Sequence, residues 1–430
     1  MRPRLLLVVS LLLVAAACAD DPSIPTAGSS TTIDAAGLSD AVEQLVVSAE
    51  EVRGLEFVVA PEVAIVTAEE LAERVREQIE EDLDPDEIMA FQSLYELLGL
   101  LDGSIDLGQA YTDLYAEQVG GFYDSDTGEL VIMGGAQLTP LSMTIVVHEL
   151  VHALTDQHFD FADQVDDLID AEEFEQAAAI QALVEGDATY YQLIYLQSLP
   201  IDAQVAAVEE SLAVETTVLD ALPSWFGEDL VFPYDSGFGF VERLITEGGA
   251  AAVNQAYEHF PETTEQILHP EKYSIFEPAL PVEIPDFDLA GYEVFEESTF
   301  GEWNARLLLL DGVGLGEVVV SSAGWGGDRY RLYWQNVPDC AAVGGCTVPV
   351  AFVYSYQGDS PRDATEFRDS LVTSVSRRMS VGSARSTEPG VTTFSGGGNF
   401  AWVSLDGEQV LFVAADDPSL GQALIAGITG

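Results

Sequence analysis

Two histidines and a glutamate in one apolar segment are the residues of this 430-residue chain best suited to chemistry. His148, Glu149 and His152 follow the pattern His-Glu-x-x-His. Residues four apart lie on the same face of a helix, so both imidazoles can reach one Zn²⁺ while the glutamate points toward a water on that metal. The chain holds only five histidines, which makes two ordinary histidines at this spacing a poor alternative. The pattern predicts the minimum apparatus of a zinc hydrolase.

The residues around this motif predict the helix that carries it. Thr139 can cap the N-terminus of the helix, and Pro140 suits its first turn. Apolar residues follow at helical spacing beside the histidines, namely Met143, Val147, Leu150, Val151 and Leu154. We therefore expect a buried helix that can hold metal ligands in fixed positions.

Two histidines do not hold zinc alone, so a third protein ligand is needed. His158, six residues after His152, stands at the third-ligand position of the metzincin pattern. That pattern needs a glycine where Thr155 stands, because the chain must turn sharply there. The only downstream methionine, Met379, lies too far along the chain to form the metzincin Met-turn. We do not expect His158 to bind the metal.

The second candidate for the third ligand is Glu185, 33 residues after His152. It lies in the centre of an apolar, helix-like run from Ala177 to Tyr191. A buried carboxylate without a partner is costly, and coordination to a metal offsets that cost. Asp187 and Thr189 are close enough to orient a ligand histidine from the second shell. The alternative is a solvent-facing glutamate on an amphipathic helix.

With these two motifs the chain resembles the gluzincins, metallopeptidases that combine His-Glu-x-x-His with a glutamate on a following helix. The resemblance covers about residues 105 to 275 and is carried by the histidine motif and by Val-Glu-Gly-Asp-Ala around Glu185. It implies that His148, His152 and Glu185 bind one Zn²⁺ per chain and that Glu149 is the general base and proton shuttle. The chain departs from the thermolysin branch, which has an asparagine before the glutamate and an aspartate four residues after it, not two.

Tyr234 and His269 are rival candidates for a hydrogen-bond donor to the oxyanion. The segment Phe232–Gly249 resembles the Tyr-x-x-Gly-x-x-Phe-Val helix that follows the third ligand in peptidases of this group, which implies the role for Tyr234. His269 lies in a His-Pro turn near Lys272, the only lysine of the chain. Either residue can instead be structural, Tyr234 as a packed aromatic and His269 as part of the turn.

The remaining pattern predicts an α+β fold. The resemblance implies a gluzincin-like, mainly helical catalytic domain with a small β-sheet at residues 38–284, which is followed by a second α+β domain at 285–430. In the first domain we expect a helix from about residue 40, a strand at about 55–67, helices at about 68–83 and 85–101, and a hairpin at Val119–Met133. The edge of this hairpin is a candidate for pairing with extended substrate, and a purely structural hairpin is the alternative. In the second domain we expect strands at 317–321, 330–334, 351–354 and 409–413, and helices at 363–378 and 419–428.

The N-terminus has the layout of a secretory signal. Residues 1–17 combine a basic start, an apolar run too short for a membrane span, and three alanines before Cys18. The junction resembles a bacterial lipobox, which implies cleavage before Cys18, lipidation of its thiol, and a flexible tether at 18–37. Cleavage after Ala17 or Ala19 with release of the protein is the alternative.

The other two cysteines and the charge agree with an exported protein. Cys340 and Cys346 enclose a short loop and would form a disulfide outside the cytoplasm. The net charge of −59 is spread along the chain, so it indicates a surface adaptation. It disfavours nucleic acid and anionic membrane surfaces as partners.

Together these patterns predict an exported, lipid-anchored zinc metallopeptidase on the outer face of the membrane. It would hydrolyse a peptide or protein substrate through a zinc-bound water activated by Glu149, and would touch the membrane only through its N-terminal lipid. The alternative is a non-catalytic zinc-binding surface lipoprotein that uses the same ligands. A closed site with four ligands favours the alternative, whereas three ligands and an open position favour catalysis.

Overall fold

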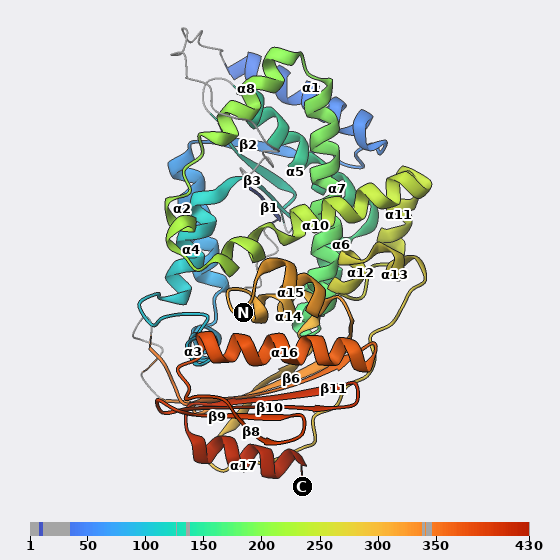
Figure 1. Ribbon diagram of the computed structural model, residues 1–430. Coiled ribbons are helices and arrows are strands. Elements are labelled where there is room, and N and C mark those ends of the chain that lie inside the picture. Colours follow the sequence, from blue (N-terminus) through green and yellow to red (C-terminus); the bar gives the residue numbers. More distant parts are fainter. Residues whose placement is uncertain are drawn as a thin grey trace.

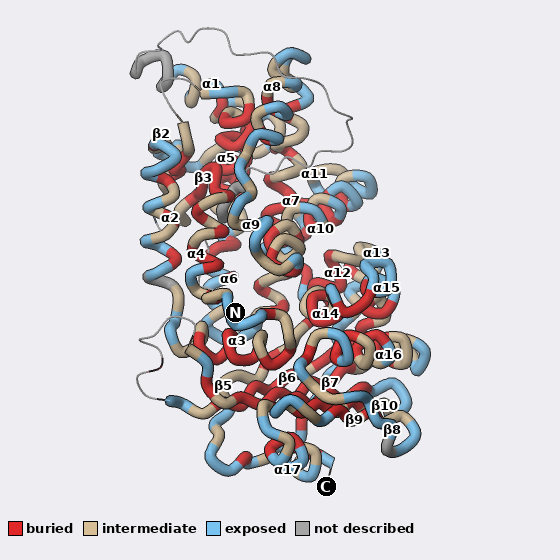
Figure 2. The backbone as a smooth tube through the Cα atoms, turned by 60° about the vertical axis from the view of Figure 1, so that its left-hand side comes forward, coloured by how far each residue is buried: buried red, intermediate tan, exposed pale blue. Residues whose placement is uncertain are grey.

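The computed structural model describes residues 8–11, 35–125, 127–134, 138–337, 340 and 346–429. Cys18 and most of the predicted tether lie outside these residues. The fold is α+β, with a small sheet among many helices in the N-terminal part and a large antiparallel sheet in the C-terminal part (Figure 1). Figure 2 shows that the buried residues concentrate along α5 and α7 and in the large sheet.

The small sheet has the strand order β1-β3-β4-β2. Its central hairpin is the predicted one, and β2 pairs in parallel with β4. The short strand β1 lies antiparallel on the outer edge of β3, with Val8 opposite Tyr123 and Ser10 opposite Gly121. The strands are β1 (Val8–Leu11), β2 (Glu62–Val66), β3 (Val119–Asp124) and β4 (Glu129–Met133).

Helices surround this sheet and supply the candidate site. The helix α5 packs against β3 on one side and against α7 and α1 on the other, and α10 packs along α7. The helices are α1 (Ala35–Arg53), α2 (Ala68–Asp82), α3 (Pro85–Leu98), α4 (Leu107–Gln118), α5 (Pro140–Phe159), α6 (Phe161–Asp170), α7 (Phe174–Ser198), α8 (Ile201–Leu212), α9 (Thr217–Ala221), α10 (Ser224–Gly248), α11 (Ala250–Glu258), α12 (Thr264–Leu268) and α13 (Pro270–Ser274).

The C-terminal part is built on a seven-stranded sheet with the order β5-β6-β7-β11-β10-β9-β8. Alternate residues of β7 point to opposite faces, where α16 covers one face and α17 the other (Figure 1). The elements are β5 (Glu293–Ser298), α14 (Gly301–Leu309), α15 (Leu315–Ser322), β6 (Trp325–Trp334), β7 (Val350–Gly358), α16 (Pro361–Arg378), β8 (Arg385–Glu388), β9 (Val391–Gly396), β10 (Asn399–Asp406), β11 (Gln409–Ala415) and α17 (Pro418–Thr429).

The expected strand at 317–321 is wrong, because this segment forms the helix α15. Its run of three valines favours a strand by propensity. The buried residues, however, are Val318, Ser321 and Ser322, which have the spacing of one helical face. Packing of that face against α14 and α16 overrides the propensity of the valines.

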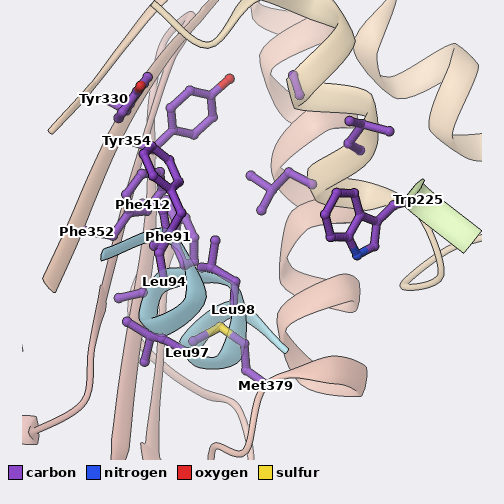
Figure 3. Close-up of a cluster of buried hydrophobic side chains, with 14 of the residues drawn as sticks. Phe91, Leu94, Leu97, Leu98, Trp225, Tyr330, Phe352, Tyr354, Met379 and Phe412 are labelled. Atoms are coloured by element: carbon purple, nitrogen blue, oxygen red, sulfur yellow. The ribbon is translucent and has the colours of Figure 1, made fainter. Parts of the chain in front are cut away.

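The helix α3 belongs to the N-terminal half of the sequence but packs on the large sheet. Phe91, Leu94 and Leu98 share one buried cluster with Phe352 and Phe412 of the sheet, as Figure 3 shows. The backbone N–H of Val348 also donates to the hydroxyl of Ser93 over 2.8 Å. The hydrophobic core therefore continues across residues 284 and 285, where the sequence predicts a domain boundary.

Candidate metal centre

The helix α5 carries His148, Glu149 and His152 and begins where the sequence predicts. The Thr139 hydroxyl accepts from the backbone N–H of Ser142, the Ser142 hydroxyl accepts from that of Thr139, and Pro140 occupies the first turn. Every residue from Leu141 to Thr155 except Met143 is buried. The motif is thus held on a helix that is fixed on several sides.

Glu185 on α7 lies beside the two histidines of α5. Two glycines, Gly186 and Gly237, allow α7 and α10 to pack closely at this point. A Cβ atom on Gly186 would overlap the backbone of Gly237 in α10, and one on Gly237 would overlap the carbonyl of Ala182. The two helices therefore touch backbone to backbone. This close crossing brings Tyr234, one helical turn before Gly237, to the side of Glu185.

The two histidines and Glu185 converge on one point. Oε2 of Glu185 lies 3.2 Å from Nε2 of His148 and 3.4 Å from Nε2 of His152. All three residues are no more than 1 % exposed, and their ligand atoms lie within 4.8 Å of one another. Tetrahedral zinc with bonds of about 2.0–2.1 Å separates its ligand atoms by about 3.3 Å. The two separations between Glu185 and the histidines fit that geometry.

The hydrogen bonds around His148 indicate which of its nitrogens faces Glu185. Nε2 of Gln192 donates to the Thr144 hydroxyl over 3.3 Å, so the amide oxygen of Gln192 faces Nδ1 of His148 at 3.1 Å. Nδ1 therefore donates to Gln192, and Nε2 is the nitrogen that faces Glu185. The separation of 3.2 Å between Nε2 and Oε2 allows either a proton on Nε2 or a metal ion to join the two groups.

The protonation states in the group follow from its burial and its close contacts. Burial lowers the pKa of His152 to about 4, although Glu185 opposes the shift, so the ring is neutral at pH 7. Burial raises the pKa of Glu185, but the two histidines outweigh it and hold that pKa below its ordinary value. The donor set is therefore a neutral imidazole, a second imidazole and a carboxylate, which is a set that zinc binds.

Tyr234 and Glu149 complete the neighbourhood of the three ligands. The ring of Tyr234 stacks on that of His148, with centroids 6.2 Å apart and an interplanar angle of 27°. Burial, followed by the carboxylates of Glu185 and Glu149, raises the pKa of Tyr234 well above its ordinary value. Its hydroxyl therefore stays protonated and can donate. Glu149 itself is fully buried beside His148 on α5.

The other histidines considered for the site lie elsewhere. Nε2 of His158 lies 2.9 Å from the backbone carbonyl oxygen of Glu56 and donates to it. His269 pairs with Glu302 on α14, Nε2 to Oε2 at 3.0 Å, and the same glutamate pairs with Arg306. Of the two rival donors to the oxyanion, Tyr234 is the one that the fold brings against a ligand.

Neither of the predicted second-shell residues, Asp187 and Thr189, forms a hydrogen bond with His148 or His152 among the described residues. Asp187 pairs with Arg53 and accepts from Tyr257, and Oγ1 of Thr189 has no hydrogen-bond partner within the described part of the chain. The contact with His148 comes from Gln192, which the sequence reasoning missed. Gln192 follows Glu185 by seven residues and so lies on the same face of α7, a spacing that could have revealed it.

Tyr115 on α4 was also missed. Burial raises its pKa above the ordinary value, and the carboxylates of Asp229 and Glu185 add to the shift. A second phenol therefore lies within the electrostatic reach of Glu185. No metal-binding pattern in the sequence points to it, because it follows from how α4 packs.

The predicted pair of cysteines lies in the segment between β6 and β7, where a disulfide joins Cys340 and Cys346.

A family model described as a domain of unknown function, DUF8575, matches residues 292–424. This span runs from β5 into α17 and contains neither α5 nor α7. No curated protein and no solved structure matches the chain.

Proposed function

We propose that this protein is a zinc-dependent peptidase in which His148, His152 and Glu185 bind one Zn²⁺. The observation that carries the proposal is the convergence of three buried ligand atoms from α5 and α7, with separations that suit tetrahedral zinc. The resemblance to gluzincins supports the same ligands. Among the described residues this is the group of His, Cys, Asp and Glu side chains close enough to hold a metal.

The chemistry follows from the residues around the ligands. A bound Zn²⁺ would lower the pKa of a water molecule toward neutrality and polarise the scissile carbonyl. Glu149 would accept the proton of the attacking water and deliver it to the leaving amine. The protonated hydroxyl of Tyr234 would donate a hydrogen bond to the developing oxyanion, which contributes on the order of 2–4 kcal/mol to transition-state binding.

The small sheet supports an extended peptide as the substrate. The strand β3 packs on α5, and its outer edge pairs antiparallel with β1. An edge that pairs with one extended segment can pair with another by strand addition. The residues of β1 fall within the proposed signal peptide, so cleavage of that peptide would leave this edge to a substrate.

We also propose that the enzyme is exported and anchored by a lipid on Cys18. The disulfide between Cys340 and Cys346 supports an oxidising compartment. No helix in the described part of the chain is long and apolar enough to cross a membrane. Mass spectrometry of the mature N-terminus tests the proposal, and an unmodified chain that begins at Cys18 or Asp20 and is released into the medium would contradict it.

The experiment that tests the catalytic proposal is the substitution Glu149→Gln. Because Glu149 is not a ligand, the variant should keep about one zinc per chain, as in wild type. It should cleave unfolded casein about 10²–10⁴-fold more slowly, because the general base is lost. The matched control is Glu73→Gln on the surface of α2, which should retain full activity.

Two results would contradict the peptidase mechanism. Equal activity of wild type and Glu149→Gln would exclude Glu149 as the base. A wild-type protein that binds zinc but cleaves no peptide would favour the zinc-binding lipoprotein.

A further inference from the structure

A buried ion pair lies next to the third ligand. Arg53, the last residue of α1, places Nε 2.9 Å from Oδ2 of Asp187, and both side chains are fully buried. The hydroxyl of Tyr257 in α11 donates to the same oxygen over 3.1 Å. The guanidinium of Arg53 also lies over the ring of Tyr191, 5.2 Å from its centroid. Three helices thus meet around one carboxylate.

This ion pair is an inefficient way to stabilise a fold. Taking both charges out of water carries a large desolvation penalty, which a buried pair offsets only when its remaining donors and acceptors are also satisfied. Within the described part of the chain, neither Nη atom of Arg53 nor Oδ1 of Asp187 has a hydrogen-bond partner. Replacement of such a pair by apolar side chains of similar size is often neutral or stabilising. The pair is therefore weak evidence for a role in stability alone.

The position of Asp187 indicates that role. Successive residues of an α-helix are rotated by about 100°, so Glu185 and Asp187 point to nearly opposite sides of α7. Glu185 meets the histidines of α5, Gly186 meets the backbone of α10, and Asp187 meets α1 and α11. Three consecutive residues thus fix the rotation of α7 at the turn that carries the metal ligand.

We propose that Arg53 and Tyr257 are positioning residues that hold Asp187, and through it the orientation of α7, so that Glu185 stays in place as a ligand. The inference rests on the proposed zinc site. It differs from a role in orienting a histidine, because the partners of Asp187 are Arg53 and Tyr257. The helix α1 thereby contributes to metal binding without contacting the metal.

The test measures the metal site separately from stability. Zinc affinity is determined by competition with a chelator, the ligand geometry by the visible absorption of the Co²⁺-substituted protein, and the stability by urea unfolding. Arg53→Met should weaken zinc binding and change the Co²⁺ spectrum, with a loss of up to about 10-fold, because groups that contact a ligand directly contribute about 10–100-fold and Arg53 acts one contact further away. Tyr257→Phe should act in the same direction with a smaller loss. Arg76→Met, on the surface of α2, is the matched control and should behave as wild type.

A double variant separates positioning from stability. Arg53→Met/Asp187→Leu removes both buried charges, so its urea midpoint should recover at least part of the loss in Arg53→Met. Its zinc affinity should stay low, because apolar packing does not replace the directional hydrogen bonds from Arg53 and Tyr257 that hold Asp187. A double variant that folds and binds zinc with the wild-type affinity and Co²⁺ spectrum would overturn the inference.

The remaining outcomes are also decisive. If Arg53→Met does not fold, Tyr257→Phe decides, and wild-type affinity with an unchanged Co²⁺ spectrum in that variant would contradict the positioning role. A wild-type protein that binds no zinc would overturn the proposed function. Failure of the positioning inference alone would appear as normal zinc binding in wild type and in all these variants.

Discussion

Two buried carboxylates, one in each half of the molecule, have opposite surroundings. Asp328 in β6 is 4 % exposed and accepts hydrogen bonds from the indole of Trp325, the hydroxyl of Tyr354 and the backbone N–H groups of Phe300 and Gly301. Glu185 in α7 instead turns one oxygen toward two imidazole nitrogens. Neutral donors satisfy the first carboxylate, whereas the surroundings of the second suit a cation.

The pKa values of Asp328 and Glu185 shift in opposite directions, in agreement with their different surroundings. Burial raises the pKa of Asp328 to about 6, because its hydrogen bonds do not fully offset the loss of water. Burial acts on Glu185 too, but the histidines hold its pKa below the ordinary value. A buried carboxylate is therefore a candidate metal ligand when it faces other ligands, and a structural group when it faces neutral donors.

The largest expected effect is loss of bound zinc, and only substitutions of the predicted ligands in the helical half should cause it. His148→Ala and Glu185→Ala should each remove bound zinc or weaken it strongly, since two remaining ligands do not hold it. Zinc content after dialysis against a weak chelator measures this. Asp328→Asn and His158→Ala should both keep about one zinc per chain. Loss of zinc in His158→Ala, with zinc retained in Glu185→Ala, would mean that the metzincin arrangement is the correct one.

The next effect concerns the two rival donors to the oxyanion. Tyr234→Phe keeps the ring against His148 but removes the hydroxyl, so kcat should fall about 10²–10³-fold with zinc content unchanged. His269→Gln should have little effect on kcat, because His269 pairs with Glu302. The kinetics of peptide cleavage measure both. A large loss in His269→Gln with none in Tyr234→Phe would exchange the two roles.

The smallest expected effect is a pH-dependent change in stability that comes from Asp328 in the large sheet. The ordinary pKa of Asp328 is 3.8, and the folded protein raises it to about 6. The folded state is therefore more stable when the carboxyl of Asp328 is protonated. This contribution is complete below pH about 4 and is lost as the pH rises through about 6. It corresponds to about 3 kcal/mol of unfolding free energy. Asp328→Asn cannot titrate, and its amide nitrogen would face donors at a cost of about 1–3 kcal/mol.

Urea unfolding between pH 4 and pH 7 measures this difference. The deficit of Asp328→Asn relative to wild type should be largest at pH 4 and should shrink toward pH 7. The exposed substitution Asp202→Asn on α8 serves as the control for a change in net charge. A deficit that grows with pH would show that Asp328 is stabilising as an anion.

Local patterns explain which parts of the site the sequence could predict. The capped helix α5, the spacing of His148 and His152 and the buried Glu185 are all encoded within a few turns of helix. Arg53, which meets Asp187 from 134 residues away, leaves no such signal. Tyr115 and the assignment of α3 to the large sheet likewise depend on packing between distant segments. The valines of α15 misled the prediction because burial on one face, and not propensity, decided the element.

The packing of α3 on the large sheet has a consequence for the order of folding. Ser93 and Val348 are hydrogen-bonded across 255 residues, so the part of α3 that packs on the large sheet lacks this partner until β7 has been synthesised. At translation rates of about 5–20 residues per second, that delay lasts on the order of ten to fifty seconds. During this time the part of α3 that later meets the sheet stays uncovered by it. Apolar surface exposed in this way favours aggregation of an incompletely folded chain.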